Sequence, residues 1–557
     1  MRGVILALLL LGISQAVDRS KFKSCIHSGF CQRHRAVKNA TGYKVESDSV
    51  KFNATALNAI IKNEDNKLSV AIVALEDSSL RVFIDETGTP LRARYQPLDA
   101  LTGEPKQQKL KKTEKEEESA FIETADGHKA VLHFSPFYID IYSKRKLVLS
   151  INSRELLKFE HFRKGRKIKK DGEGFWEESF GDSRDLKPYG SSSVGVDIDL
   201  IGFRYAFGIP EHAEGLSLRN TVGYEPYRLY NLDVFEYDIS SPMALYGSIP
   251  YLTAVNPDRS IGVLWLNSAE TWVDGRHGSI VGTDELPASR ISQVNTRVFS
   301  ETGAVDILVF LGPRPYDVVR QFTSLTGVYP LPPIFSLGYH QSRWNYKDDK
   351  DVKEVSEKFF EKEIPLDVIW LDIEHTDQKK YFTWDKEFFP NPIEMIELLK
   401  EKGRKLVNIV DPHIKKDTKY SVYTEFGREK LFVKDSDGKT DYVGNCWPGD
   451  SKYYNGTTND VYIWNDMNEP SVFSGPEVTM HKDAVHHGGL EHREVHNMYG
   501  FYQHQATWNG LKERSENSLR PFVLTRSFFI GSQRTAAVWT GDNTADWNHL
   551  KVSFAVL

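Results

Sequence analysis

Cysteine is scarce in this sequence, and neither sign of charge is in surplus. Three cysteines in 557 residues exclude a small domain held together by disulfides. A net charge of -6, from 71 basic and 77 acidic residues, excludes the strongly basic surface typical of nucleic-acid-binding proteins. Beyond the N-terminus, no apolar run reaches the roughly 20 residues that a membrane span needs. We therefore expect a globular protein with no nucleic-acid partner and no membrane span.

The N-terminus carries the one continuous apolar stretch. Arg2 precedes the apolar residues 4–13, and Ser14 and Ala16 are small residues at positions -3 and -1 of a cleavage site. The stretch is too short to span a membrane. We predict that residues 1–16 are a secretory signal peptide. The alternative, a buried N-terminal helix, accounts less well for the charge, the length and the cleavage site together.

The cysteines and glycosylation signals fit a secretory compartment. Cys25 and Cys31 lie six residues apart in a polar segment (17–44), where a small oxidised loop is reasonable. Cys446 stands alone and is expected to pack unpaired. Sequons for N-glycosylation occur at Asn39, Asn53 and Asn455, although such tripeptides also arise by chance.

The length requires two or more domains, and the first of them is predicted to be all-β. Residues 45–330 contain short alternating apolar runs bounded by Gly, Asp, Asn and Pro, as at Leu68, Val70 and Ile72. This pattern predicts a β-sandwich. Residues 106–119 are charged and poor in apolar side chains, so we expect a mobile loop there.

Near residue 330 the pattern changes to strands that alternate with helices. Helices are expected at 352–362 and 392–402, and this alternation predicts a parallel sheet or barrel over residues 331–557. The expected strands lie near residues 335–340, 367–372, 405–410, 461–466, 521–526 and 536–541. A closed (β/α) barrel has eight strands, so six predict a partial barrel that lacks its last strands.

The segment WNDMNEP, residues 464–470, concentrates the chemistry. Asp466 and Glu469 follow the apolar run 461–463, so a buried strand would deliver carboxylates to the rim where parallel barrels keep their active sites. Carboxylates beside an aromatic wall are what sugar hydrolysis requires. The alternative is an acidic surface loop after a strand.

WNDMNEP resembles the nucleophile signature of glycoside hydrolase family 31, which contains the retaining α-glucosidases. Other blocks resemble that family in its order: GYHQSRWNY (338–346), DVIWLDIEH (367–375), KLVNIVDPH (405–413), RPFVLTRSFF (520–529) and AVWTGDNTADW (537–547). Upstream, three blocks resemble its endoplasmic-reticulum branch: FGIPEHA (207–213), EPYRLYNLDVF (225–235) and PMALYGSIP (242–250). The similarity runs from about Cys25 to Lys551.

The resemblance implies a retaining mechanism, with Asp466 as the nucleophile and Asp542 as the acid/base. Retention requires two carboxyl groups about 5–5.5 Å apart across the glycosidic bond. Each of these residues follows an apolar strand, so both would project from one rim. Glu469 is the rival carboxylate, but it lies three residues further on and is expected to have left the rim.

The resemblance also implies substrate-binding roles for Asp233, Asp372 and Arg526. From the residues alone, a salt bridge at the barrel mouth is the alternative for Asp372 and Arg526, and an ordinary turn is the alternative for Asp233. Trp370, Trp464 and Trp539 are candidates either for stacking on sugar faces or for the core.

Further expectations follow from the same resemblance. It implies a galactose-mutarotase-like β-sandwich before the TIM barrel, a disulfide between Cys25 and Cys31, and no metal or other cofactor. The histidines at 486–487 and 492–496 lack the spacing of a zinc hydrolase. The implied activity is the removal of α-1,3-linked glucose from N-linked glycans in the endoplasmic-reticulum lumen, with a non-catalytic β subunit as partner.

Two departures from the family keep other interpretations open. We find no counterpart of its last two barrel strands, of its later β-domains or of a substrate-binding histidine. Residues 450–463 are also too few for the helix expected in that crossover. These features favour an inactive truncated isoform that binds carbohydrate or the β subunit without hydrolysis. A secreted or lysosomal α-glucosidase of the same family is a further alternative.

Overall fold

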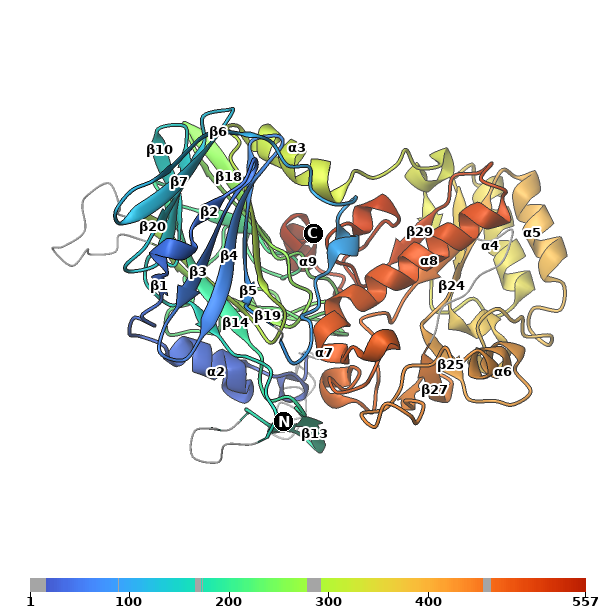
Figure 1. Cartoon of the computed structure of the whole chain (residues 1–557). Helices are drawn as coiled ribbons and strands as arrows, with labels where there is room; N and C mark the ends of the chain where they lie inside the picture. Colours follow the sequence, from blue (N-terminus) through green and yellow to red (C-terminus); the bar gives the residue numbers. More distant parts are fainter. Residues whose placement is uncertain are drawn as a thin grey trace, which may run out of the picture.

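The computed structural model describes residues 17–88, 90–165, 172, 174–277, 292–453 and 462–556. Within them, a β-sandwich packs beside a region of alternating strands and helices (Figure 1). The predicted signal peptide and the sequon at Asn455 lie outside the described residues, whereas Asn39 and Asn53 are exposed. No helix in the described ranges combines the length and the hydrophobicity needed to cross a bilayer.

Two antiparallel sheets form the sandwich, which confirms the predicted β-sandwich. The first contains β1 (Lys44–Val45), β2 (Lys51–Phe52), β3 (Ala56–Lys62), β4 (Lys67–Leu75), β5 (Ser79–Glu86), β15 (Ala206–Gly208), β17 (Tyr251–Asn256), β18 (Arg259–Trp265) and β21 (Val305–Phe310). The second contains β6 (Leu110–Lys115), β7 (Ser119–Thr124), β8 (Lys129–His133), β9 (Tyr138–Ser143), β10 (Lys146–Ile151), β11 (Lys158–Phe159), β14 (Val194–Ile201), β16 (Tyr227–Leu229), β19 (Thr271–His277) and β20 (Ser292–Ser300). A separate hairpin joins β12 (Glu177–Phe180) to β13 (Ser183–Leu186).

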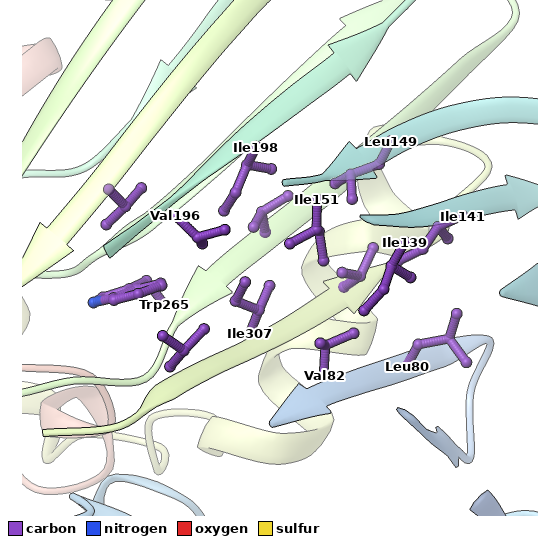
Figure 2. Close-up of a cluster of buried hydrophobic side chains, with 14 of the residues drawn as sticks. Leu80, Val82, Ile139, Ile141, Leu149, Ile151, Val196, Ile198, Trp265 and Ile307 are labelled. Carbon is purple, nitrogen blue, oxygen red and sulfur yellow. The ribbon is translucent and has the colours of Figure 1, made fainter. Parts of the chain in front are cut away.

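The alternating apolar side chains of the two sheets meet in one core. Val82 of β5 and Ile307 of β21 belong to the same buried cluster as Ile139 of β9 and Ile198 of β14 (Figure 2). Alternation places every second side chain of a strand on the inner face of its sheet. The alternating apolar residues seen in the sequence are therefore the ones that pack in the core. Each fully buried aliphatic side chain contributes about 1.5–3 kcal/mol, which gives this domain its own source of stability.

The expectation of a mobile loop at residues 106–119 is wrong. Residues Leu110–Lys115 form β6, the edge strand of the second sheet, which pairs antiparallel with β7. All but the first of its residues are exposed, among them Lys112 and Glu114. Edge strands commonly carry such charges because charge discourages pairing with another chain, so the composition of an edge strand resembles that of a loop.

The N-terminal segment is fixed to the sandwich. A disulfide joins Cys25 and Cys31, and helix α2 (Gly29–Ala36) follows the first of them. Both cysteines pack with Trp272 of β19 and Phe299 of β20 in a buried cluster. Cys446 is buried and unpaired.

A parallel half-barrel follows the sandwich, as predicted for the TIM-barrel domain. Its five strands, in sheet order, are β22 (His340–Gln341), β23 (Val368–Leu371), β24 (Lys405–Ile409), β28 (Tyr462–Asn465) and β29 (Val523–Thr525). The helices of the region are α4 (Asp349–Glu361), α5 (Pro392–Glu401), α6 (Ser421–Arg428), α7 (His492–Val495), α8 (Tyr499–Arg514) and α9 (Trp547–Val556), and α3 (Pro315–Thr326) precedes it. A small sheet of β25 (His413–Lys415), β26 (Gly444–Cys446) and β27 (Gly449–Tyr453) lies between β24 and β28.

Three expectations about this region need correction. Residues 536–541 form no strand; they add only a single parallel bridge between Leu524 of β29 and Ala537, and no described strand flanks them on their other side. Most of 335–340 is a 3-10 helix, Ile334–Leu337, and the strand begins at His340. The crossover from β24 to β28 does contain a helix, α6, which lies earlier than residues 450–463.

Candidate active site

Three of the predicted site residues follow parallel strands of one sheet. Asp372 follows β23, Asp466 follows β28 and Arg526 follows β29. The strands run in one direction and in register, with Ile463 opposite Val523. Because the carboxyl ends of parallel strands meet at one edge, all three side chains reach the same rim.

A cavity of about 620 Å³ opens at this rim. Its lining includes all five residues predicted to act on substrate: Asp233, Asp372, Asp466, Arg526 and Asp542. The volume falls in the range of about 300–1,000 Å³ that is usual for small-molecule sites. The fold therefore brings these residues together, although their individual roles stay predictions.

Arg526 lies at the centre of the site and is only 3% exposed. Its guanidinium nitrogens lie 3.4 Å from Asp233, 3.2 Å from Asp466, 3.2 Å from Asp542 and 2.8 Å from Glu469. Four carboxylates share one cation. Burial raises the pKa of Asp466, and repulsion from Asp542 and Glu469 adds to that rise.

Glu469 faces Arg526 and not the cavity. It is fully buried and accepts two hydrogen bonds, at 2.8 and 2.9 Å, from the Nε and Nη2 atoms of Arg526. Such a two-pronged pairing fixes the plane of the guanidinium. Glu469 does not line the cavity, and sequence reasoning missed its part in orienting Arg526.

Burial changes the protonation of the cavity carboxylates. It raises the pKa of Asp466 and of Asp542, and the attraction of Arg526 opposes both shifts. Burial also raises the pKa of Asp372 to about 6, helped by repulsion from Glu374 and Asp542. A raised pKa is what lets a carboxylic acid donate a proton near neutral pH.

Tyr246 is a central residue that sequence reasoning missed. Its buried hydroxyl donates to the carbonyl of Val234 at 2.7 Å, and the backbone N–H of Asp542 donates to the same hydroxyl at 3.2 Å. The Arg526 guanidinium lies 4.9 Å from the centre of its ring. Gly541 is required beside that ring, because a Cβ there would fall 2.2 Å from it. Tyr246 thereby ties the loop of Asp233 to the segment of Asp542.

Aromatic side chains form the mouth of the cavity. Trp344, Trp447 and Phe473 line it and are 64%, 40% and 40% exposed, respectively. The ring centroids of Trp344 and Trp447 lie 5.7 Å apart, and those of Trp447 and Phe473 lie 4.9 Å apart. Exposed aromatic groups of this size mark binding surfaces, and none of the three was singled out from the sequence.

The three tryptophans named from the sequence lie in two different environments. Trp464 and Trp539 line the cavity and pack against each other with centroids 5.7 Å apart. Trp370 is 6% exposed, and its indole N–H donates to His340 at 2.9 Å. Trp370 is therefore a core residue.

The histidines near residue 490 form a hydrogen-bonded chain. His486 Nε2 lies 2.9 Å from His492 Nδ1, and His492 Nε2 lies 2.7 Å from His496 Nδ1. His496 Nε2 lies 2.7 Å from the carbonyl oxygen of Asn231, which can only accept. In the described residues, no three side chains of metal-ligating type come close enough to hold an ion.

Comparison with known proteins places this arrangement in a family. The profile described as the TIM-barrel domain of glycosyl hydrolases family 31 matches residues 329–557. The profile described as the glycosyl hydrolase 31 N-terminal galactose mutarotase-like domain matches residues 69–274. The chain belongs to glycoside hydrolase family 31.

Within that family, the similarity to one enzyme is high. The chain is 47% identical to neutral alpha-glucosidase AB of Homo sapiens over 99% of its own length and 65% of that protein. It matches a crystal structure of the glucosidase II alpha subunit, bound to Glc1Man2, with a TM-score of 0.90 and 42% identity over 96% of this chain and 64% of that one. The catalytic subunit in a structure of the ER glucosidase II heterodimer matches equally well, with the same coverage of both chains.

The chain thus spans about 65% of the length of the curated relatives that it matches. The alignment with the human relative runs over 615 positions, more than the 557 residues present here, so that relative has additional residues inside the matched span.

Proposed function

We propose that the cavity is the active site of a retaining α-glucosidase that removes α-1,3-linked glucose from N-linked glycans. The observation that carries the proposal is the convergence of Asp466 and Asp542 on one guanidinium, inside a cavity of about 620 Å³ with an aromatic mouth. The similarity to glucosidase II, one structure of which is titled as bound to Glc1Man2, supports this substrate class.

In the first step, the Asp466 carboxylate attacks the anomeric carbon of the glucose. The C–O bond to the leaving group breaks as the new ester bond forms, and Asp542 gives its proton to the departing oxygen. In the second step, water attacks the anomeric carbon, its proton passes to Asp542, and the carboxylate of Asp466 leaves. Two inversions give overall retention, and Asp542 ends protonated as it began.

Asp233, Asp372 and Arg526 would position the glucose. Carboxylates accept hydrogen bonds from sugar hydroxyls, and the guanidinium can donate to them. A site that pairs each hydroxyl discriminates against sugars that lack or misplace one, because a buried polar group is then left without a partner. The exposed rings of Trp344, Trp447 and Phe473 would contact the sugar beyond the scissile bond.

We further propose the endoplasmic-reticulum lumen as the location and a glucosidase II β subunit as the partner. The predicted signal peptide and the disulfide between Cys25 and Cys31 support a secretory compartment. The solved heterodimer of catalytic and regulatory subunits supports the partner.

The open half-barrel favours a second candidate, which is sugar binding without hydrolysis. In the described residues the parallel sheet ends at β22 on one side and at β29 on the other. Leu331, Ile334 and Leu337, which precede β22, are 69%, 83% and 70% exposed. An active site with an open wall can bind a glucoside and still hold the reacting groups too loosely for hydrolysis.

Hydrolysis of an aryl α-glucoside separates the two candidates. For a retaining α-glucosidase, proton NMR should show α-glucose as the first product, before mutarotation mixes the anomers. Initial release of β-glucose would reject the retaining mechanism. Saturable binding of methyl α-glucoside with no aryl release would establish the second candidate instead.

The pKa of Asp372 predicts how glucoside binding depends on pH. The ionised carboxylate accepts hydroxyl hydrogen bonds, and its pKa is raised to about 6, so acceptance is lost as the pH falls through 6. The affinity for methyl α-glucoside, which does not titrate, should drop about tenfold between about pH 7 and about pH 5. In the Asp372→Asn variant the affinity should be lower and nearly independent of pH. An unchanged slope in that variant would assign the titration to another group.

A further inference from the structure

A second cavity, of about 790 Å³, lies on the outer face of the β-sandwich. Its lining includes Arg35, Arg154, Arg276 and Arg297, and it shares no residue with the candidate active site. It lies in the size range of small-molecule sites, about 300–1,000 Å³.

The strands explain why this face is polar. In β20, Val294 and Val298 belong to the sandwich core, whereas Asn295 and Arg297 point to the opposite face. Further along that face, Phe299 is covered by the disulfide-linked segment that leads into α2. At the end of α2, the backbone carbonyls of His34 and Val37 accept hydrogen bonds from Arg297, and the part of the face beside them is left open as the cavity.

Positive charge is in excess around the cavity. Arg35 pairs with Asp274 at 3.0 Å, and Arg154 lies 3.2 Å from Asp199. The other cations of the lining are Lys38, Arg276 and Arg297. In the part of the chain that the structure describes, no carboxylate forms an ion pair with any of these three. The cavity therefore presents positively charged side chains with which a bound anion could form ion pairs.

Arg297 is the strongest indication of a ligand. It is 5% exposed, and its Nη atoms donate only to the neutral backbone carbonyls of His34, Val37 and Leu156. Its Nε has no hydrogen-bond partner among the described residues, and burial lowers its pKa to about 10. Asp197 and Asp274 attract the guanidinium without forming an ion pair with it, so the cost of burying this cation is only partly offset. An anion bound in the cavity would offset it further.

Asn295 adds a second requirement. Its side-chain N–H donates to Asp199 at 2.7 Å, but its buried Oδ1 accepts from no donor in the described residues. A sugar hydroxyl group can supply that donor, and so can the O–H of partly protonated inorganic phosphate, whereas a carboxylate ion cannot.

We propose that this cavity binds a small ligand that combines an oxyanion with hydroxyl groups, which is the chemistry of sugar phosphates and sugar acids. Arg297 and Arg276 would hold the oxyanion, and Asn295 would accept from a hydroxyl. The proposal does not depend on hydrolysis in the active site.

Calorimetric titration of the whole chain at low ionic strength tests the proposal. Glucose 6-phosphate should bind about tenfold more tightly than inorganic phosphate or glucose, because it carries an oxyanion for Arg297 together with several hydroxyl donors for Asn295. Glucuronate replaces the phosphate by a carboxylate, so whichever of the two sugars binds more tightly identifies the oxyanion. Equal affinity for glucose 6-phosphate and inorganic phosphate would overturn the sugar part, and no binding of any anion would overturn the site.

Two variants and a matched control test whether the ligand binds in this cavity. Arg276 is exposed, so Arg276→Ser should fold normally and weaken the binding of glucose 6-phosphate about tenfold. Arg297→Met should abolish the binding. Arg204 is an exposed cation of the same domain outside the cavity, and Arg204→Ser should change nothing. Unaltered affinity in Arg276→Ser, or equal weakening in Arg204→Ser, would overturn the assignment.

Discussion

Replacement of Asp466 by alanine is expected to lower kcat for an aryl α-glucoside by a factor on the order of 10⁴ or more, as for other catalytic nucleophiles. Asp466 follows β28 and lines the cavity, 3.2 Å from the guanidinium of Arg526. Without its carboxylate, no covalent glycosyl-enzyme can form. Steady-state kinetics measure the loss, and an unchanged thermal unfolding curve would show that the fold is intact.

Azide distinguishes the nucleophile from the acid/base. In Asp466→Ala, azide can occupy the vacated space and attack the anomeric carbon directly, which gives β-glucosyl azide. In Asp542→Ala, the glycosyl-enzyme still forms from a substrate with a good leaving group, and azide then attacks it to give α-glucosyl azide. If Asp466→Ala gave the α-azide and Asp542→Ala gave the β-azide, the two role assignments would be reversed. If azide restored activity to neither variant, both assignments would be rejected.

The sequence was sufficient for those residues whose place follows from local structure. An apolar strand that ends in Asp372 or Asp466 predicts a carboxylate at the rim of a parallel sheet, and parallel register then brings Arg526 to the same rim. Asp542 and Asp233 needed the family resemblance, because they lie 309 positions apart in the chain and neither follows a described strand directly.

Tertiary contacts account for what the sequence did not reveal. Tyr246 and Glu469 act through groups that are remote in sequence, so no local pattern distinguishes them from core residues. Residues 110–115 and 536–541 were misassigned for opposite reasons. The first is a charged strand stabilised by its neighbour β7. The second is an apolar segment that contacts β29 by a single bridge and has no described strand on its other side.

An ionic cluster at the junction of the sandwich and the half-barrel carries the largest expected effect on stability. Lys482 is 7% exposed and donates to Glu270 and, at 2.7 Å, to Glu301. The same carboxylates pair with Arg228 and Arg493, respectively. Glu270, Glu301 and Arg228 belong to the sandwich, whereas Lys482 and Arg493 follow β28, so the cluster holds the two regions together.

Replacement of Lys482 by methionine is expected to reduce the free energy of unfolding by about 3–5 kcal/mol, because two buried carboxylates lose a shared cation. Burial alone would raise the pKa of Glu270, but Arg228 and Lys482 hold it below its usual value. A carboxyl with a depressed pKa stabilises the fold above its unfolded pKa, and this contribution is lost as the pH falls. The difference between wild type and Lys482→Met in urea unfolding should therefore be full near pH 7 and shrink in acid.

The control for this prediction is an ion pair of the same types on the surface. Lys358 pairs with Glu354 along α4, and both side chains are more than 60% exposed. Water already solvates that pair, so Lys358→Met should leave the free energy of unfolding nearly unchanged at any pH. If Lys482→Met cost as little as Lys358→Met, the buried cluster would contribute nothing net to the junction. If the cost of Lys482→Met stayed the same in acid, the lost stability would come from the packing of the lysine side chain and not from its charge. The Nζ atom of Lys482 lies 5.0 Å from the ring centre of Tyr230.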